Sequence, residues 1–177
     1  MRRERECSLF DTFSSDDLIF AFFPCVRFTD MCLLTFTGHS AHNWSIEQKI
    51  ERSKKLGTEQ ANLYELFCDL FLICIRKNLK LIVENPYSSR HYATMHFPIA
   101  ATIIDKDRRL LGDNFCKPTS YWFLNIAPKF NKIEYHPPFM FGNRLPELEK
   151  NIKHTHGINR SLISPKYAEN FIRKYIL

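Results

Sequence analysis

The chain has 177 residues, a formal charge of +6, 16 phenylalanines and only 5 glycines, and 45% of its residues are hydrophobic. A chain of this length and hydrophobicity can bury the core of one domain, which argues against disorder, and its mild positive charge suits contact with a polyanion. The six cysteines show no CxxC spacing, which favours reduced thiols over disulfides and argues against a metal site. The N-terminus has no signal core and the apolar stretches are interrupted early, which favours a cytoplasmic protein with no membrane contact.

After a polar segment over residues 1–15, the sequence predicts a strand, a long helix and a second strand within a single domain over 16–177. The run Leu18–Phe22 is apolar throughout, which is typical of a strand covered on both faces in a parallel sheet. Ser45 and Gln48 form a capping box at the start of a helical region that continues to about residue 77. Residues 79–83 form the second apolar run. A helical crossover makes the two strands parallel, so their carboxyl ends would meet at one edge.

The second half of the chain predicts shorter elements. Residues 91–98 have no clear period, 100–104 predict a short strand, and 105–109 predict a charged turn. The aromatic run 121–126 predicts another strand, and 128–159 predicts a long loop or the remnant of a small lobe. Ser164 and Pro165 then begin a C-terminal helix. The fold class predicted from these elements is α/β.

Pro24 and Cys25 directly follow the first predicted strand. In open α/β sheets, ligands bind at the carboxyl ends of strands, and a thiolate placed there can add to an electron-poor ring carbon. Arg27 would lower the pKa of that thiol or hold a phosphate. The alternatives are that Cys25 is a small buried hydrophobic residue and that Arg27 is simply solvated.

Glu84, Asn85 and Pro86 end the second predicted strand. A carboxyl in a partly apolar pocket has a raised pKa, so Glu84 would protonate or hydrogen-bond a ring nitrogen. Asn85 would fix the glutamate or bind an exocyclic group, and Pro24 and Pro86 would hold the two turns rigid. The alternative is an ordinary strand end with turn-forming residues.

Four motifs together resemble one enzyme family. Pro24-Cys25 resembles the proline-cysteine motif of the cytosine-5 DNA methyltransferases, and Glu84-Asn85 is similar to their glutamate-asparagine motif on a later strand. The segment 117–119, Lys-Pro-Thr before an aromatic strand, resembles phage-type members, and 160–165 resembles their C-terminal end. The resemblance runs from about residue 16 to the end of the chain.

The resemblance implies a Rossmann-like methyltransferase sheet with helices on both faces, in a bacterial or phage-infected cell. In the mechanism it implies, a cytosine is flipped out of DNA, Cys25 adds to the ring, Glu84 engages a ring nitrogen, and S-adenosylmethionine supplies the methyl group. The substrate-binding residues that the resemblance implies are Pro24, Arg27, Asn85, Pro86, Lys117 and Thr119.

The residues before 16 differ from the family pattern, because no glycine-rich turn for the cofactor precedes the first predicted strand. The fold is therefore expected to be truncated at its N-terminus, with cofactor-binding residues unknown. Three alternatives follow: a methyltransferase-like protein that is inactive, an enzyme completed by a second chain carrying the cofactor-binding half, or a non-catalytic nucleic-acid-binding or interaction protein derived from that fold. Whether the substrate is DNA or a free nucleotide is left open.

Overall fold

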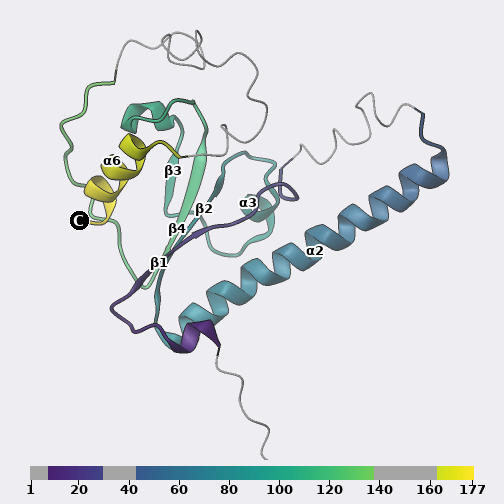
Figure 1. The fold of residues 1–177 in the computed structure, drawn as a ribbon, viewed down its shortest axis with the longest axis horizontal. Helices are drawn as coiled ribbons and strands as arrows, with labels where there is room; N and C mark the ends of the chain where they lie inside the picture. Colours follow the sequence, from purple (N-terminus) through teal and green to yellow (C-terminus); the bar gives the residue numbers. More distant parts are fainter. Residues whose placement is uncertain (1–7, 30–42, 138–162) are drawn as a thin grey trace, which may run out of the picture.

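The structure, a computed structural model, describes residues 8–29, 43–137 and 163–177 (Figure 1). An open four-stranded sheet lies at its centre, in the order β1-β2-β4-β3. Its strands are β1 (Leu18–Phe22), β2 (Lys80–Pro86), β3 (Ile103–Asp105) and β4 (Thr119–Leu124). The predicted α/β class is confirmed. The sheet is mixed, however, because β1 and β2 are parallel whereas β4 runs antiparallel to both β2 and β3.

One helix, α2 (Ile46–Lys77), makes the whole connection between β1 and β2. The predicted capping box is present: Ser45 Oγ accepts from the Gln48 backbone N–H, and the Gln48 side chain accepts from the Ser45 N–H. The helix ends at Asn78, a left-handed residue whose N–H reaches the Cys74 and Ile75 carbonyls. Figure 1 shows the first half of α2 extending away from the sheet. The predicted helical region therefore forms one continuous helix, from Ile46 to Lys77.

Helices cover both faces of the sheet. On one face the second half of α2 packs on alternate residues of β2 and β4; this core includes Phe67, Phe71, Cys74, Leu81, Val83 and Trp122. On the opposite face lies α6 (Pro165–Tyr175), capped by Ser164 as predicted. This second core includes Ile82, Ile103, Leu111, Tyr121, Tyr167 and Phe171. Adjacent residues of β2 therefore point into different cores, as the two-residue period of a strand requires.

β1 lies at the edge of the sheet, yet the middle of the strand is packed on both faces: Ile19 and Ala21 lie against the core on the α2 side and Phe20 against the core on the α6 side. Its two ends are more open. Leu18 is 37% exposed and Phe22 59% exposed. The continuous apolar run thus predicts that both faces of the strand are packed, but it does not predict that the strand lies at the edge of the sheet.

The shorter elements differ in detail from the prediction. A short helix, α3 (Tyr92–His96), lies in the region expected to be irregular, and the 3-10 helix η4 (Arg108–Leu111) begins within the predicted charged turn. Another 3-10 helix, η1 (Leu9–Asp11), precedes β1. Residues 128–137 form no helix or strand, as expected, and the rest of the predicted loop over 128–159 lies outside the described residues, as do 160–162. None of the helices described has both the length and the apolar character to cross a bilayer.

Candidate functional site

The backbones of β1 and β2 bring the two predicted strand ends together. The strands are parallel, with Phe22 paired to Glu84, and the Phe23 N–H donates to the Glu84 carbonyl oxygen at 3.4 Å. The carboxyl ends of both strands therefore lie at the same edge, as predicted. Pro24 and Cys25 begin the loop that leaves this edge.

Asn85 fixes the cysteine loop to β2. Its Nδ2 donates to the Phe23 carbonyl oxygen at 2.8 Å, and its side chain is fully buried. This bond holds the residue directly before Pro24, so Asn85 acts on the loop of the thiol rather than on the glutamate. Its Oδ1 is buried and accepts no hydrogen bond from the residues described.

Cys25 is a free thiol on a half-buried residue. Its carbonyl oxygen accepts from the Phe28 N–H at 2.9 Å, which closes a tight turn over a fully buried phenylalanine. The turn is thus anchored in the α2 core at Phe28, whereas Pro24 is exposed. This arrangement differs from a cysteine sealed in the core, because solvent still reaches the residue.

Glu84 points to the opposite face of the sheet from Asn85 and is only 6% exposed. Burial raises the pKa of its carboxyl, while the positive charges of Lys117 and Arg108 act in the opposite direction. The Arg108 Nη1 lies 3.9 Å from the Glu84 Oε1, too far for a hydrogen bond, and Oε1 accepts none within the described part of the chain. Glu84 is therefore a buried acid with a free oxygen and a raised affinity for its proton.

Arg108 was not predicted as a site residue. It is completely buried, forms an ion pair with Asp113, and its guanidinium carbon lies 4.6 Å from the centre of the Tyr167 ring. A buried arginine needs such partners, because an uncompensated charge in the interior is costly. In the sequence it belongs to a run of charged residues typical of a solvated turn, whereas in the fold Tyr167 of α6 packs over it and Asp113 pairs with it.

Two tyrosines and an aspartate connect α6 to the sheet behind Glu84. The Tyr167 hydroxyl donates to Asp105 Oδ2 at 2.9 Å, so the Tyr121 hydroxyl, 2.7 Å away, donates to Tyr167. Burial raises the pKa of both tyrosines and of Asp105. Both hydroxyls therefore keep their protons at neutral pH and hold this face of the site rigid.

The segment 117–119 lies beside the end of β2. The Tyr87 N–H donates to the Pro118 carbonyl oxygen at 2.8 Å, and Thr119 pairs with Pro86 in the β2–β4 ladder. Thr119 is fully buried, and its hydroxyl donates to the Lys117 carbonyl oxygen at 2.8 Å. Thr119 therefore shapes the turn, while the ammonium group of Lys117 is the part of this segment that acts on Glu84.

Arg27 is directed to α2. Its Nε lies 2.6 Å from Glu59 Oε2, and its carbonyl oxygen accepts from Gln60 Nε2 at 2.8 Å. Arg27 thus anchors the end of the cysteine loop to the helix. Of the predicted site residues, Pro24, Cys25, Glu84, Asn85, Pro86, Lys117 and Thr119 belong to segments that meet at the end of β2.

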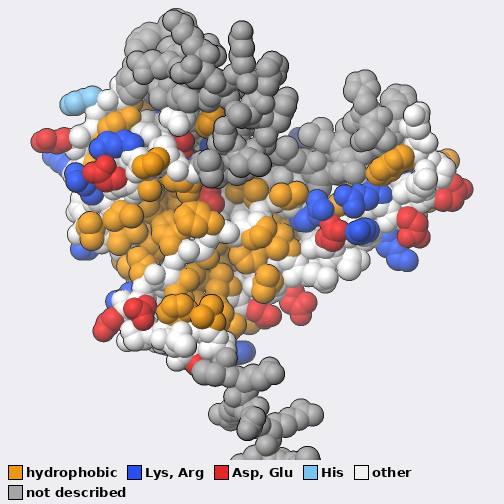
Figure 2. Space-filling view, viewed as in Figure 1, with side chains coloured by type: hydrophobic (Ala, Val, Ile, Leu, Met, Phe, Trp, Pro, Cys, Tyr) orange, Lys and Arg blue, Asp and Glu red, His pale blue; other side chains and the backbone are white. Residues whose placement is uncertain are grey.

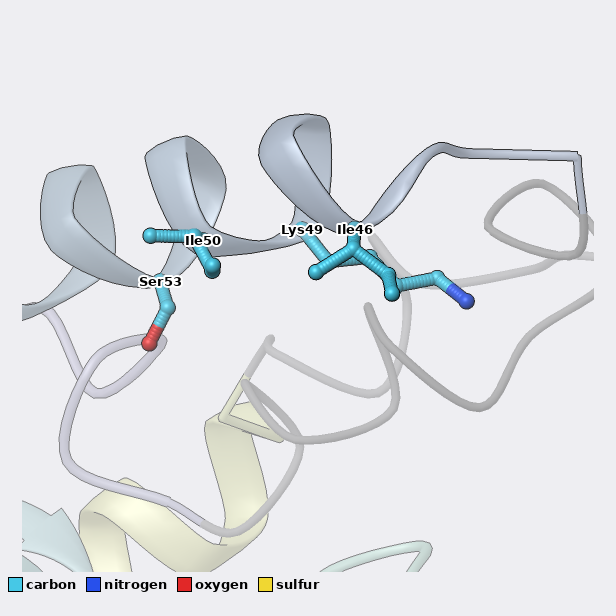
Figure 3. A pocket seen from close by; sticks show the side chains of 4 residues that line it. All are labelled: Ile46, Lys49, Ile50 and Ser53. Carbon is cyan, nitrogen blue, oxygen red and sulfur yellow. The ribbon is translucent and has the colours of Figure 1, made fainter.

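A separate hollow of about 270 Å³ lies on the projecting part of α2 (Figure 3). It is lined by Ile46, Lys49, Ile50 and Ser53 and contains none of the residues above. Its lining brings together no pair of groups with acid, base or nucleophilic chemistry, so it does not compete with the strand ends as a catalytic site.

The described residues do not fit a cradle for S-adenosylmethionine. Residues 8–17, before β1, contain no glycine, and the two described glycines lie in α2 and at the end of η4. Glycine is the usual residue where a backbone approaches a ligand closely. Comparisons of the chain with protein-family models, with curated proteins and with solved structures found no match.

Proposed function

We propose that this chain is the base-binding part of a cytosine-5 DNA methyltransferase-like protein, with Cys25 as nucleophile and Glu84 as the acid that binds the ring. One observation carries the proposal: the pairing of Phe22 with Glu84 and the Asn85–Phe23 hydrogen bond hold the cysteine loop at the strand end that bears a buried glutamate. We also propose that the four-stranded sheet is a truncated Rossmann-like sheet. The β1–α2–β2 crossover, with helices on both faces, supports it.

The chemistry of these two residues is a conjugate addition to cytosine. Once the Cys25 thiol has lost its proton to solvent, its sulfur forms a bond to C6 of the ring. The C5=C6 π pair shifts to C4–C5, the C4=N3 π pair moves onto N3, and N3 takes the proton of Glu84, which becomes a carboxylate. Burial raises the pKa of Glu84, which favours the protonated form that this step needs. The product is electron-rich at C5, the atom that a methyl group would join.

The proposed substrate is DNA. A single base leaves the stack of the DNA and enters the site. Lys117 supplies a positive charge beside Glu84, and the +6 charge of the chain favours approach to phosphate. S-adenosylmethionine would be the methyl donor.

Covalent trapping tests the proposal without the cofactor. A single-stranded oligonucleotide carrying pyrimidin-2-one in place of cytosine is more electron-poor at C6, and a single strand removes the cost of base flipping. We expect a one-to-one covalent adduct by mass spectrometry. Cys25→Ser should abolish it, whereas Cys116→Ser, which changes another half-buried free thiol, should leave it unchanged.

A free pyrimidin-2-one nucleoside in a parallel reaction distinguishes a polymer substrate from a free nucleotide. An adduct with the nucleoside at equal rate would favour the free nucleotide. Adduct formation that survives Cys25→Ser, or no adduct with either probe, would contradict the proposed chemistry.

The second candidate is a non-catalytic nucleic-acid-binding protein with the same scaffold, favoured by the lack of a glycine-rich turn in the described residues before β1. It predicts that the oligonucleotide binds with a strong salt dependence but forms no adduct. The trapping experiment therefore decides between the two.

A further inference from the structure

Glu84, Arg108 and Asp113 form a buried cluster of charged side chains. Figure 2 shows charged side chains mainly along α2 and around the rim of the molecule, as is usual for a folded protein. The three residues of this cluster are instead 6%, 0% and 2% exposed. A charge in the interior is costly unless an opposite charge lies beside it, so the way these groups share their charges decides which carboxyl is ionised.

Arg108 lies between two carboxyl groups but forms a close ion pair with only one of them. Its Nη2 pairs with Asp113 Oδ2, whereas its Nη1 stays 3.9 Å from Glu84 Oε1, beyond hydrogen-bond distance. Arg108 Nη1 and Glu84 Oε1 are both buried, and neither makes a hydrogen bond within the described part of the chain. The guanidinium therefore compensates the charge of Asp113 and leaves Glu84 beside a cation that it does not bond.

The turn that follows η4 fixes Asp113 on its side of Arg108. The Asp113 N–H donates to the Arg108 carbonyl oxygen at 3.1 Å, and Asp113 Oδ1 accepts from the Asn114 N–H at 2.6 Å. The start of α6 holds the same turn, because Ser164 Oγ donates to the Gly112 carbonyl oxygen at 2.7 Å. The Asp113 carboxylate is thus positioned by its own turn and by α6, independently of β2.

The other charged and titratable groups that act on Glu84 or Arg108 come from β3, β4, α6 and the segment before β4. They are Asp105, Tyr121, Tyr167 and Lys117. Lys117 is a second cation for Glu84, burial raises the pKa of both tyrosines so that they stay neutral, and Asp105 accepts from the Tyr167 hydroxyl. Asp113 is therefore the carboxylate that holds the guanidinium of Arg108 directly.

We propose that Asp113 is a positioning residue for the acid of the site: by holding Arg108, it prevents the guanidinium from closing an ion pair with Glu84. The use of Glu84 as an acid rests on the proposed function, whereas the sharing of Arg108 between two carboxyls does not. Without the charge of Asp113, Arg108 would be a buried cation that lacks its counter-ion. Glu84, 3.9 Å away, would then release its proton and take over the pair.

An NMR titration of the Glu84 carboxyl carbon in the full chain, without ligand, tests this proposal. The loss of one resonance in Glu84→Gln identifies the signal. In Asp113→Asn we expect the proton affinity of Glu84 to fall about ten-fold or more, because pairing with an arginine favours the ionised form of a carboxyl. An Asp113→Asn chain that folds at no pH would show that Glu84 does not replace Asp113, and would overturn the proposal.

A double variant, Arg108→Met with Asp113→Asn, separates this effect from a general loosening of the fold. Replacing both members of a buried ion pair by uncharged side chains often costs little stability. The double variant also removes one of the two cations that favour the Glu84 carboxylate, so we expect the proton affinity of Glu84 to rise above the wild-type value. Loosening would lower it in both variants, towards the value of an exposed glutamate.

Asp107→Asn is the matched control. Asp107 forms the neighbouring carboxylate–arginine pair at η4, with its Oδ2 2.6 Å from Arg109 Nη2, and it also caps this helix. The same substitution there should change the proton affinity of Glu84 less than about two-fold. Equal falls in the two single variants, no fall in Asp113→Asn, or a fall in the double variant would each contradict the role of Asp113.

The titration and the trapping experiment fail independently. Shifts of Glu84 in the expected directions, without any covalent adduct, would retain the role of Asp113 and reject the Cys25 chemistry. An adduct from the wild-type chain, with no shift of Glu84 in Asp113→Asn, would retain the chemistry and reject the positioning role.

Discussion

Glu84 is subject to two opposing effects at one carboxyl group. Desolvation favours its protonated form, and the cations Lys117 and Arg108 favour the carboxylate. The net direction is an upward shift, because the ion pair with Arg108 is long and Arg108 is shared with Asp113. At any given pH, the raised pKa makes the protonated form of Glu84 more populated than that of an exposed glutamate.

The raised pKa of Glu84 predicts a pH-dependent loss of stability. Folded Glu84 binds its proton more tightly than unfolded glutamate, so the free energy of unfolding falls as pH rises from about 4.5 to the folded pKa. Glu84→Gln removes this fall. We expect the variant to gain stability relative to the wild type across that window, by about 1.4 kcal/mol for each tenfold increase in the proton affinity of folded Glu84, and the difference to level off above it. Urea unfolding between pH 4 and 9 measures both curves.

Glu169→Gln is the control for this measurement. The side chain of Lys166, together with Arg173, lowers the pKa of this exposed carboxyl, so its contribution to stability is lost as pH falls, which is the opposite sign. A Glu84→Gln curve parallel to the wild type at all pH values would show that Glu84 titrates as an ordinary exposed glutamate.

The positions of the candidate site residues in the fold were more predictable from sequence than the contacts that support them. Cys25 and Glu84 follow apolar runs that form strands in any α/β fold, so their placement at strand ends is a local property. The burial of Arg108 and the pairing of Arg27 with Glu59 depend on side chains 59 and 32 residues away, on α6 and α2. A charged residue next to a turn has the same sequence pattern whether α6 covers it or water does.

At the scale of elements, α2 shows which signals are local. Its start at Ser45 and its end at Asn78 are fixed by hydrogen bonds between near neighbours, so the sequence predicts both. The edge position of β1 and the antiparallel direction of β4 depend on which strands are adjacent. An apolar run in the sequence does not show which strands lie beside it in the sheet. Neither the edge position of β1 nor the direction of β4 could therefore be predicted from it.

Two glycines predict opposite effects of the same substitution. Gly57 lies inside α2, and a methyl group there meets no atom within 4 Å. Gly57→Ala should therefore stabilise the protein by about 0.5–1 kcal/mol, because alanine loses less backbone entropy in a helix.

Gly112 ends η4 with φ +99°, and its added Cβ would lie 2.8 Å from the Lys166 Cγ. Gly112→Ala should destabilise by about 1 kcal/mol or more.

Thermal unfolding followed by circular dichroism measures both variants. Because Gly57 lies in the part of α2 whose neighbours on the helix are mostly exposed, the gain should appear as added helix stability without a change in the core. Destabilisation by Gly57→Ala would indicate that something contacts this face of α2.

At the scale of the whole molecule, the sheet connects two cores that have no helix in common. Leu81 and Val83 belong to the α2 core and Ile82 to the α6 core, all in one strand. β4 is divided in the same way, with Trp122 on one face and Tyr121 on the other. If the strands that line one core unfold, the other core is therefore exposed as well.

This shared sheet predicts one cooperative unfolding transition. Phe67→Leu, in the α2 core, and Phe171→Leu, in the α6 core, each replace a buried ring that contacts several others. Each should destabilise the protein by about 1–3 kcal/mol and lower the same midpoint. Calorimetry and the fluorescence of Trp122, which lies in the α2 core alone, should report that midpoint together. If Phe171→Leu instead split the transition, with Trp122 fluorescence unchanged at the first step, the α6 core would be an independent unit and the sheet would not couple them.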